Sequence, residues 1–110
     1  MTVSTLIDEE AQKLAVQVSS NTHIDNYVLA ASTPENIAKP TNAKYVLLSA
    51  DGAFWAAYDK TASTGSTDIT DGTGSELLPG LIPVWRQISL VTNISVAATA
   101  ARKISALWKA

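Results

Sequence analysis

Apolar and polar residues alternate in short runs along most of the chain, and turn residues separate one run from the next. Alternation of this kind is typical of a β-strand with one buried face. Seven or eight such runs, with a turn signal every 8 to 12 residues, predict an antiparallel β-sandwich or jelly-roll-like fold, or a small barrel. The strand-like runs cover residues 27–31, 36–39, 44–50, 53–58, 82–90, 94–98 and 104–108.

The N-terminal part of the chain follows a different pattern. Ile7 and Leu14 are spaced as on one face of a helix, which predicts a short N-terminal helix. Leu14 and Val16 also alternate with small or polar residues, as in a strand, so an extended arm is the competing interpretation. We therefore divide the chain into an N-terminal arm or helix over 1–22 and a β-sandwich domain over 23–110.

The strongest turn signal lies between the runs at 44–50 and 53–58, where Asp51 is followed by Gly52. Two apolar runs on either side of Asp-Gly predict a β-hairpin, because both residues tolerate the positive φ of a type I′ turn. The segment 59–80 is too long for a plain hairpin connection. It holds four of the five glycines, and we expect a loop with one short strand near its Ile69 that contacts a partner.

The C-terminal stretch 96–109 is ambiguous. It is rich in helix formers, and Val96, Ala100 and Ile104 could line one face of a helix. The strand pattern of the rest of the chain favours a hairpin instead, with strands at 94–98 and 104–108.

Composition excludes several classes of function. The 110 residues carry a net charge of −2 and form no basic stripe, which disfavours nucleic-acid binding. Cysteine is absent, so disulfides, cysteine zinc sites and thiol catalysis are excluded. The pattern contains no signal peptide and no membrane-spanning run, which predicts a soluble protein made in the cytoplasm without a membrane partner. Only 16% of residues are charged, against about a quarter usually, which indicates a surface buried against other chains.

The titratable residues do not form a recognisable catalytic or metal-binding motif. His23 is the single histidine, which excludes a His-based triad or a two-histidine metal site. Asp68, Asp71 and Glu76 resemble a loose calcium loop, but their spacing does not match an EF-hand and is more typical of turns. We therefore expect no cofactor, no metal and no enzymatic activity. Paired carboxylates would arise only if the fold joined Asp25, Asp51 and Asp59.

The three tryptophans are Trp55, Trp85 and Trp108. A sandwich of this size rarely encloses three indole rings, because the ring is large and carries an N–H group. One or two of them are expected in the core. Trp85 precedes Arg86, and this pair of residue types is typical of interface anchors, so we expect them at a subunit contact.

Several segments together resemble one known group of proteins. Asp71-Gly72-Thr73-Gly74-Ser75-Glu76-Leu77 is the most specific of them. With the others, it makes residues 24–110 similar to small β-sandwich virion proteins of tailed bacteriophages, among them capsid decoration (cement) proteins. The other segments that carry this likeness are 26–30, 35–46, 49–55, 69–70 and 91–96.

The resemblance implies a non-enzymatic structural protein, a homotrimer that binds the major capsid protein on the surface of the capsid in the virion. It is also compatible with a tail, adaptor or fibre module that contacts a receptor or another virion protein. In the first case the chain would hold the shell through its loops and its N-terminal segment. The candidate interface residues are Leu6, Ile7, Leu14, Asp71, Glu76, Trp85 and Arg86.

Overall fold

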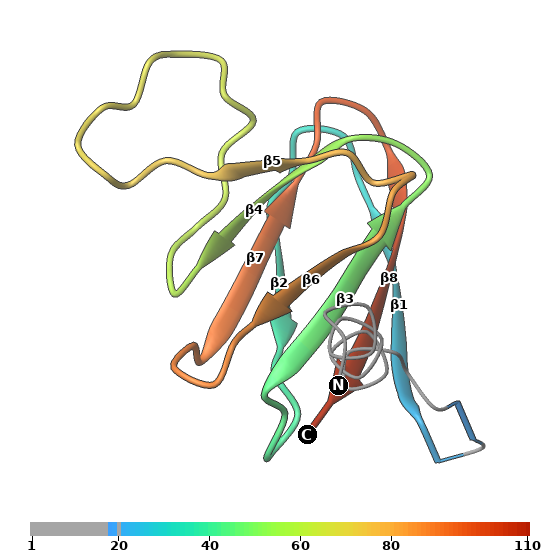
Figure 1. The fold of residues 1–110 in the computed structure, drawn as a ribbon. Helices are drawn as coiled ribbons and strands as arrows, with labels where there is room; N and C mark the ends of the chain where they lie inside the picture. Colours follow the sequence, from blue (N-terminus) through green and yellow to red (C-terminus); the bar gives the residue numbers. More distant parts are fainter. Residues whose placement is uncertain (1–17, 20) are drawn as a thin grey trace, which may run out of the picture.

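A computed structural model describes residues 18, 19 and 21–110 of the chain. The described part contains eight strands and no helix (Figure 1). The predicted all-β fold and the predicted number of strands are therefore confirmed. The helix or arm predicted over residues 1–22 falls almost wholly outside the described residues, as do the candidate interface residues Leu6, Ile7 and Leu14.

The strands form two antiparallel sheets of four strands each. Sheet A has the order β1-β8-β3-β6, and sheet B has the order β2-β7-β4-β5. Four of the pairings are nested along the chain, namely β1 with β8, β2 with β7, β3 with β6 and β4 with β5. The strands are β1 (His23–Leu29), β2 (Glu35–Ala38), β3 (Tyr45–Ala50), β4 (Phe54–Tyr58), β5 (Glu76–Leu78), β6 (Val84–Gln87), β7 (Asn93–Ala97) and β8 (Arg102–Lys109).

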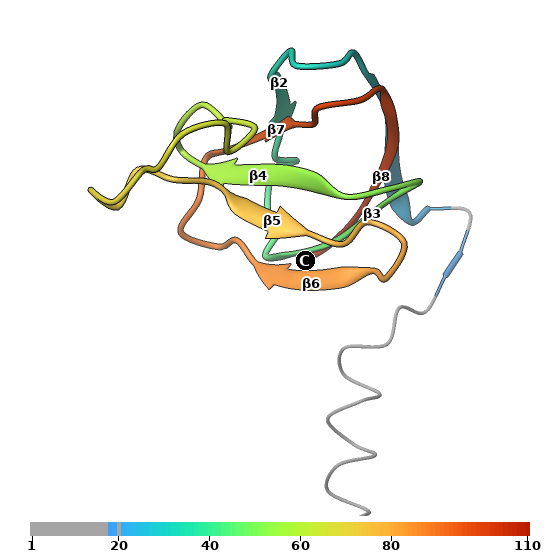
Figure 2. The same ribbon diagram turned by 90° about the horizontal axis from the view of Figure 1, so that it is seen from above.

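The two sheets pack face to face around one hydrophobic core (Figure 2). Strand β8 shows the alternation most clearly, since Ile104, Ala106 and Trp108 are buried while their neighbours are partly exposed. Phe54 and Ile94 of sheet B lie in the same core and are fully buried. Burial along β8 thus follows the period-two pattern of its sequence.

The hairpin predicted at Asp51 and Gly52 is wrong. The strands before and after this turn exist, but β3 pairs with β6 and β8 while β4 pairs with β5 and β7. The turn therefore carries the chain from one sheet to the other. Its glycine does not have the positive φ that a type I′ turn requires; among the described glycines that φ occurs at Gly65, Gly72 and Gly80.

The C-terminal stretch forms strands and not a helix, as the surrounding strand pattern predicted. The predicted hairpin between its two strands is wrong, however, because β7 belongs to sheet B and β8 to sheet A. Strand β8 pairs with β1 at one side and β3 at the other. Burial of the inner faces of the two sheets overrides the local helix propensity here.

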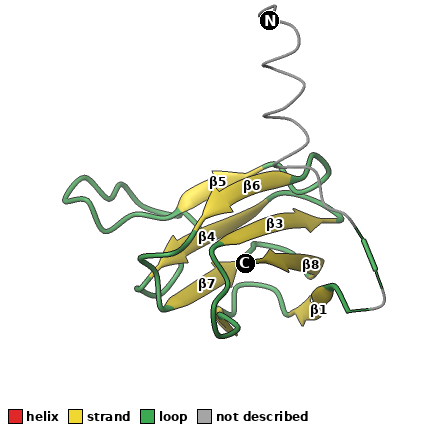
Figure 3. Ribbon diagram, turned by 60° about the horizontal axis from the view of Figure 1, so that its bottom comes forward, coloured by secondary structure: helices red, strands yellow, loops and turns green. Residues whose placement is uncertain are grey.

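The connection between β4 and β5 is a long loop that extends away from the sandwich (Figures 1 and 3). The predicted short strand near Ile69 is wrong, and the strand that does form is β5, seven residues further on. The first part of the loop lies on the outer face of sheet B, where the Ala62 N–H donates a hydrogen bond of 2.9 Å to the Ser95 hydroxyl. The tip, residues 65–73, is exposed.

Candidate functional site

The outer face of sheet A carries a row of four apolar side chains that crosses all four strands. In the register of the sheet, Ile24 of β1 lies opposite Leu107 of β8, Leu107 opposite Leu47 of β3, and Leu47 opposite Trp85 of β6. Ile24 is 45% exposed, and the other three are partly exposed. We call these four residues the apolar row.

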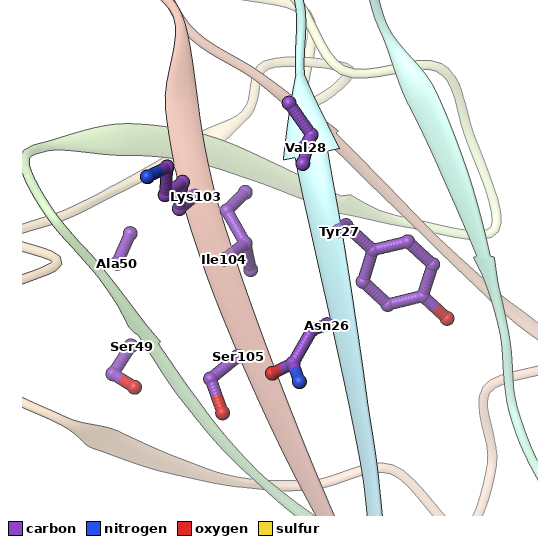
Figure 4. Close-up of a pocket in the computed structure, with 8 residues that line it drawn as sticks. All are labelled: Asn26, Tyr27, Val28, Ser49, Ala50, Lys103, Ile104 and Ser105. Carbon is purple, nitrogen blue, oxygen red and sulfur yellow. The ribbon is translucent and has the colours of Figure 1, made fainter.

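A hollow lies next to the apolar row on the same face (Figure 4). Its floor is a second row of small polar side chains, in which Asn26 lies opposite Ser105 and Ser105 opposite Ser49. Val28 and Lys103 border it, and Val28 is 80% exposed. The hollow is open and has a volume of about 360 Å³. The hollow arises because this row of small side chains lies between two rows of larger ones, the apolar row on one side and Val28 with Lys103 on the other.

The charged side chains at the outward positions of these four strands have one sign. Lys103 and Lys109 have the same outward strand parity as the apolar row, and the outward positions of the four strands include no acidic residue. The nearest carboxylate along β3 is that of Asp51, just past the strand, and it accepts a hydrogen bond of 3.1 Å from the backbone N–H of Lys103. The face therefore combines exposed apolar surface with positive charge.

The structure separates Trp85 from Arg86. Trp85 belongs to the apolar row on the outside, whereas Arg86 lies opposite the buried Val46 and faces inward. There the Arg86 guanidinium forms an ion pair with Glu76, to which its Nε also donates a hydrogen bond of 3.2 Å, while its Nη1 donates to the Trp85 carbonyl. Two candidate interface residues, Glu76 and Arg86, are therefore bonded to each other, and their role at a subunit contact stays a prediction.

Tyr58 completes this cluster, and its hydroxyl donates a hydrogen bond of 2.9 Å to Glu76 Oε2. The hydrogen bond from Arg86 lowers the pKa of Glu76, and the bond from Tyr58 adds to that effect against the opposing effect of burial. Burial and the neighbouring Glu76 raise the pKa of Tyr58 well above its ordinary value. Since Glu76 is on the edge strand of sheet B and Arg86 on the edge strand of sheet A, the cluster joins the two sheets.

A second polar cluster lies at the start of β1. The Trp108 indole N–H donates a hydrogen bond of 2.9 Å to Asp25, and the His23 ring lies 3.1 Å from both carboxylate oxygens of Asp25. His23 is half-exposed, so the imidazole lies at the surface. Asp25 supplies the hydrogen-bond acceptor that the N–H group of a buried tryptophan requires, which is a structural role.

The fold does not pair the three aspartates that could have supplied a carboxylate pair. Asp25 bonds to Trp108, Asp51 to the backbone of Lys103, and Asp59 to the backbone N–H groups of residues 92 and 93. These two backbone bonds hold the pKa of Asp59 below its ordinary value. Within the described part of the chain, no group of three or more acidic or histidine side chains could hold a metal ion.

The candidate loop residue Asp71 lies in the exposed tip. Its carboxylate accepts hydrogen bonds from the backbone N–H and the hydroxyl of Thr73, which lower its pKa. Lys60 donates a hydrogen bond of 3.0 Å to the carbonyl of Gly72 and so braces the tip against the base of the loop. Asp71 is therefore ionised and exposed at neutral pH, in a tip with a defined shape.

Comparison with known protein families, curated proteins and solved structures finds no match for this chain. Among residues 18, 19 and 21–110, none belongs to a helix long and apolar enough to cross a membrane.

Sequence reasoning identified Trp85 but missed the other members of the apolar row. Ile24, Leu47 and Leu107 each read as ordinary strand residues, because a strand pattern shows which residues share a face only within that strand. Tyr58 was also missed, and its sequence neighbours give no signal for its role. The strand register, which places residues 24, 107, 47 and 85 side by side, is what reveals the row.

Proposed function

We propose that the chain is a jelly-roll structural protein of a tailed-bacteriophage virion, which binds and stabilises the capsid shell as a homotrimer without enzymatic activity. The nested strand pairing supports the jelly roll, since it is the pairing of one long hairpin rolled into two sheets. Jelly rolls of eight strands occur in viral capsid proteins, lectins and cupins. Because a fold does not fix a function, we infer the function from the residues on the surface.

The observation that carries the proposal is the outer face of sheet A. Charged residues are depleted and aromatic residues are enriched at the centres of protein interfaces. The apolar row, with Trp85 at one end, has this composition and lies on the surface of the described chain. A second set of apolar side chains lies in loops, where Leu81, Ile82 and Leu90 are 75%, 67% and 96% exposed. A protein with two such surfaces can bind copies of itself and also a shell.

A decoration protein would stabilise the shell by mass action. It binds the assembled lattice in preference to the free subunits, so each bound copy lowers the free energy of the assembled state. In this proposal the N-terminal segment and the exposed loops contact the major capsid protein, and the sandwich is the rigid body that presents them.

Co-sedimentation with shells assembled without this chain tests the proposal. We expect the full chain to pellet with the shells and to raise the temperature at which they disassemble. A variant lacking residues 1–17 should fold, because the core lies within 23–110, but should no longer pellet. Leu90→Ser should weaken binding, whereas Thr41→Ser, a conservative change in an exposed turn, should leave it unchanged. Failure of the full chain to pellet would refute the decoration function.

The projecting loop favours one second candidate, a tail, adaptor or fibre module that contacts a receptor or another virion protein. Loops presented on a rigid scaffold are common binding elements. A glycan array probed with the full chain distinguishes the two functions. A signal that disappears when residues 66–73 are replaced by a short Gly-Ser linker would support the receptor-binding module.

A further inference from the structure

The exposed loop tip and the hollow on sheet A have complementary properties. The tip, residues 65–73, contains Asp68 and Asp71 and no basic residue, and its Ile69 is 39% exposed. The hollow is bordered by Lys103 and by the exposed Val28. An apolar side chain flanked by two carboxylates therefore matches an apolar-edged hollow flanked by positive charge.

The two surfaces of one molecule lie far from each other. The loop leaves the sandwich from β4 and β5, and in both views it extends on the side away from β1 and β8, two of the three strands that line the hollow (Figures 1 and 2). The loop of one copy can consequently meet this hollow only on another copy. A contact of this kind uses two different patches, so it is heterologous.

The same charges disfavour the alternative in which two copies pair through the outer faces of sheet A. That arrangement would place Lys103 and Lys109 of one copy near the same lysines of the other. Like charges brought together across an interface cost free energy. A head-to-tail contact places Lys103 near an aspartate of the loop tip instead.

We propose that the loop tip of one copy binds in the hollow on sheet A of a second copy, and that three such contacts close into a ring. Ile69 enters beside Val28 and the apolar row, while Asp68 pairs with Lys103. This inference rests on the homotrimer of the proposed function and assigns the contact that forms it. Heterologous contacts close into a ring when the rotation between copies allows it, and otherwise form open filaments.

Charge reversal tests the contact on the full chain, with mass measured by light scattering after size exclusion over a range of concentrations. Asp68→Lys and Lys103→Glu should each weaken the trimer about tenfold in dissociation constant, and the double variant should recover most of the loss. Lys44→Glu is the matched control, because it reverses an exposed lysine beyond the opposite end of β3, and it should leave the mass unchanged. Circular dichroism and thermal melting establish that each variant is folded.

The possible results separate this inference from the function on which it rests. A wild-type trimer that both single variants leave intact would overturn the contact but not the trimer. Weakening in each single variant without recovery in the double variant would also overturn the pairing of these residues. A wild-type monomer at every concentration would refute the trimer and this contact together, while shell co-sedimentation would still decide whether the chain is a decoration protein.

Discussion

Replacing Glu76 with Gln tests the cluster that joins the two edge strands. Glutamine has nearly the same shape, and its carbonyl can still accept the hydrogen bond from Tyr58. Its amide cannot accept the second bond from Arg86, and the charge attraction is lost. The variant therefore removes the ion pair while leaving the pairing of β5 with β4 and of β6 with β3 in place.

The expected loss of stability follows from the geometry of the cluster. Hydrogen bonds to charged groups contribute about 1.5–3 kcal/mol. The side chains of Glu76 and Arg86 are 32% and 38% exposed, so solvent screening places the effect at the low end of this range, about 1.5 kcal/mol. For a domain of 60–100 residues, 1 kcal/mol corresponds to about 4–8 °C in melting temperature. We expect Glu76→Gln to lower the melting temperature by about 6–12 °C.

The chain offers a matched control for this substitution in Glu35. It lies on β2, shares the inward face of the buried Ile37, and its Oε2 is buried without a hydrogen-bond partner. The same change, Glu35→Gln, removes the charge of a carboxylate whose Oε2 is buried without a hydrogen-bond partner, so it should leave stability unchanged or raise it. An equal loss of stability in the two variants would show that the contact of Glu76 with Arg86 does not stabilise the fold specifically.

The pH dependence gives a second measurement on the same variant. The pKa of Glu76 lies below its ordinary value of 4.5, so its carboxylate binds fewer protons in the folded state than in the unfolded state. Its contribution is therefore complete above about pH 4.5 and is lost as the pH falls through the lower folded pKa. The difference in melting temperature between wild type and Glu76→Gln should be largest at pH 7 and close toward pH 3. A difference that is absent at pH 7, or that does not narrow in acid, would refute this reasoning.

Two further predictions concern the backbone and the core, and both are measured by urea unfolding. Gly80 has a φ of +77°, and a Cβ there would collide with the carbonyl of Gly52, so Gly80→Ala should cost about 3 kcal/mol or more. Gly72→Ala, with a φ of +88° in open space, should cost only about 1 kcal/mol, and equal costs would contradict the collision. Trp108→Phe should cost about 2 kcal/mol, because it leaves Asp25 without the indole donor and removes buried volume. Asp25→Asn keeps an acceptor for the indole and should cost less than half as much.

The sequence predicted the strands far better than it predicted their partners. Alternation identifies a strand from its own residues, so β3, β4, β7 and β8 were all found close to their observed positions. Pairing depends on residues distant in the chain, and each of the two predicted hairpins joined strands that lie in different sheets. At Asp51 and Gly52 the local turn signal is real, since the chain does turn there. The signal does not specify whether the following strand pairs with the preceding one or crosses to the opposite sheet.

In the candidate site, too, the sequence predicted the features of single strands but not the contacts between strands. Trp85 and Arg86 could be singled out because their residue types are typical of interfaces. That they point to opposite faces follows from the alternation in β6, but that Arg86 bonds to Glu76 follows only from the packing of one sheet edge against the other. Strand β5, which carries Glu76, is three residues long and follows a loop rich in Gly, Ser and Thr. Such a short strand has no periodicity of its own to detect.

The structure shows where in the fold charged residues are present and where they are scarce. Glu35, Glu76 and Arg86 share the inward faces of edge strands, where the two sheets meet. The outward positions of sheet A carry two lysines, Lys103 and Lys109, and its centre is apolar or hydroxylated. The outward strand positions of sheet B carry no charged residue, so the scarcity of charge is a property of both outer faces of the sandwich. On sheet A it is combined with an aromatic residue in the apolar row, which matches the composition found at the centre of an interface. The strands that supply the outer face of sheet A are adjacent in the sheet but widely separated in the sequence, so only the folded chain forms this surface.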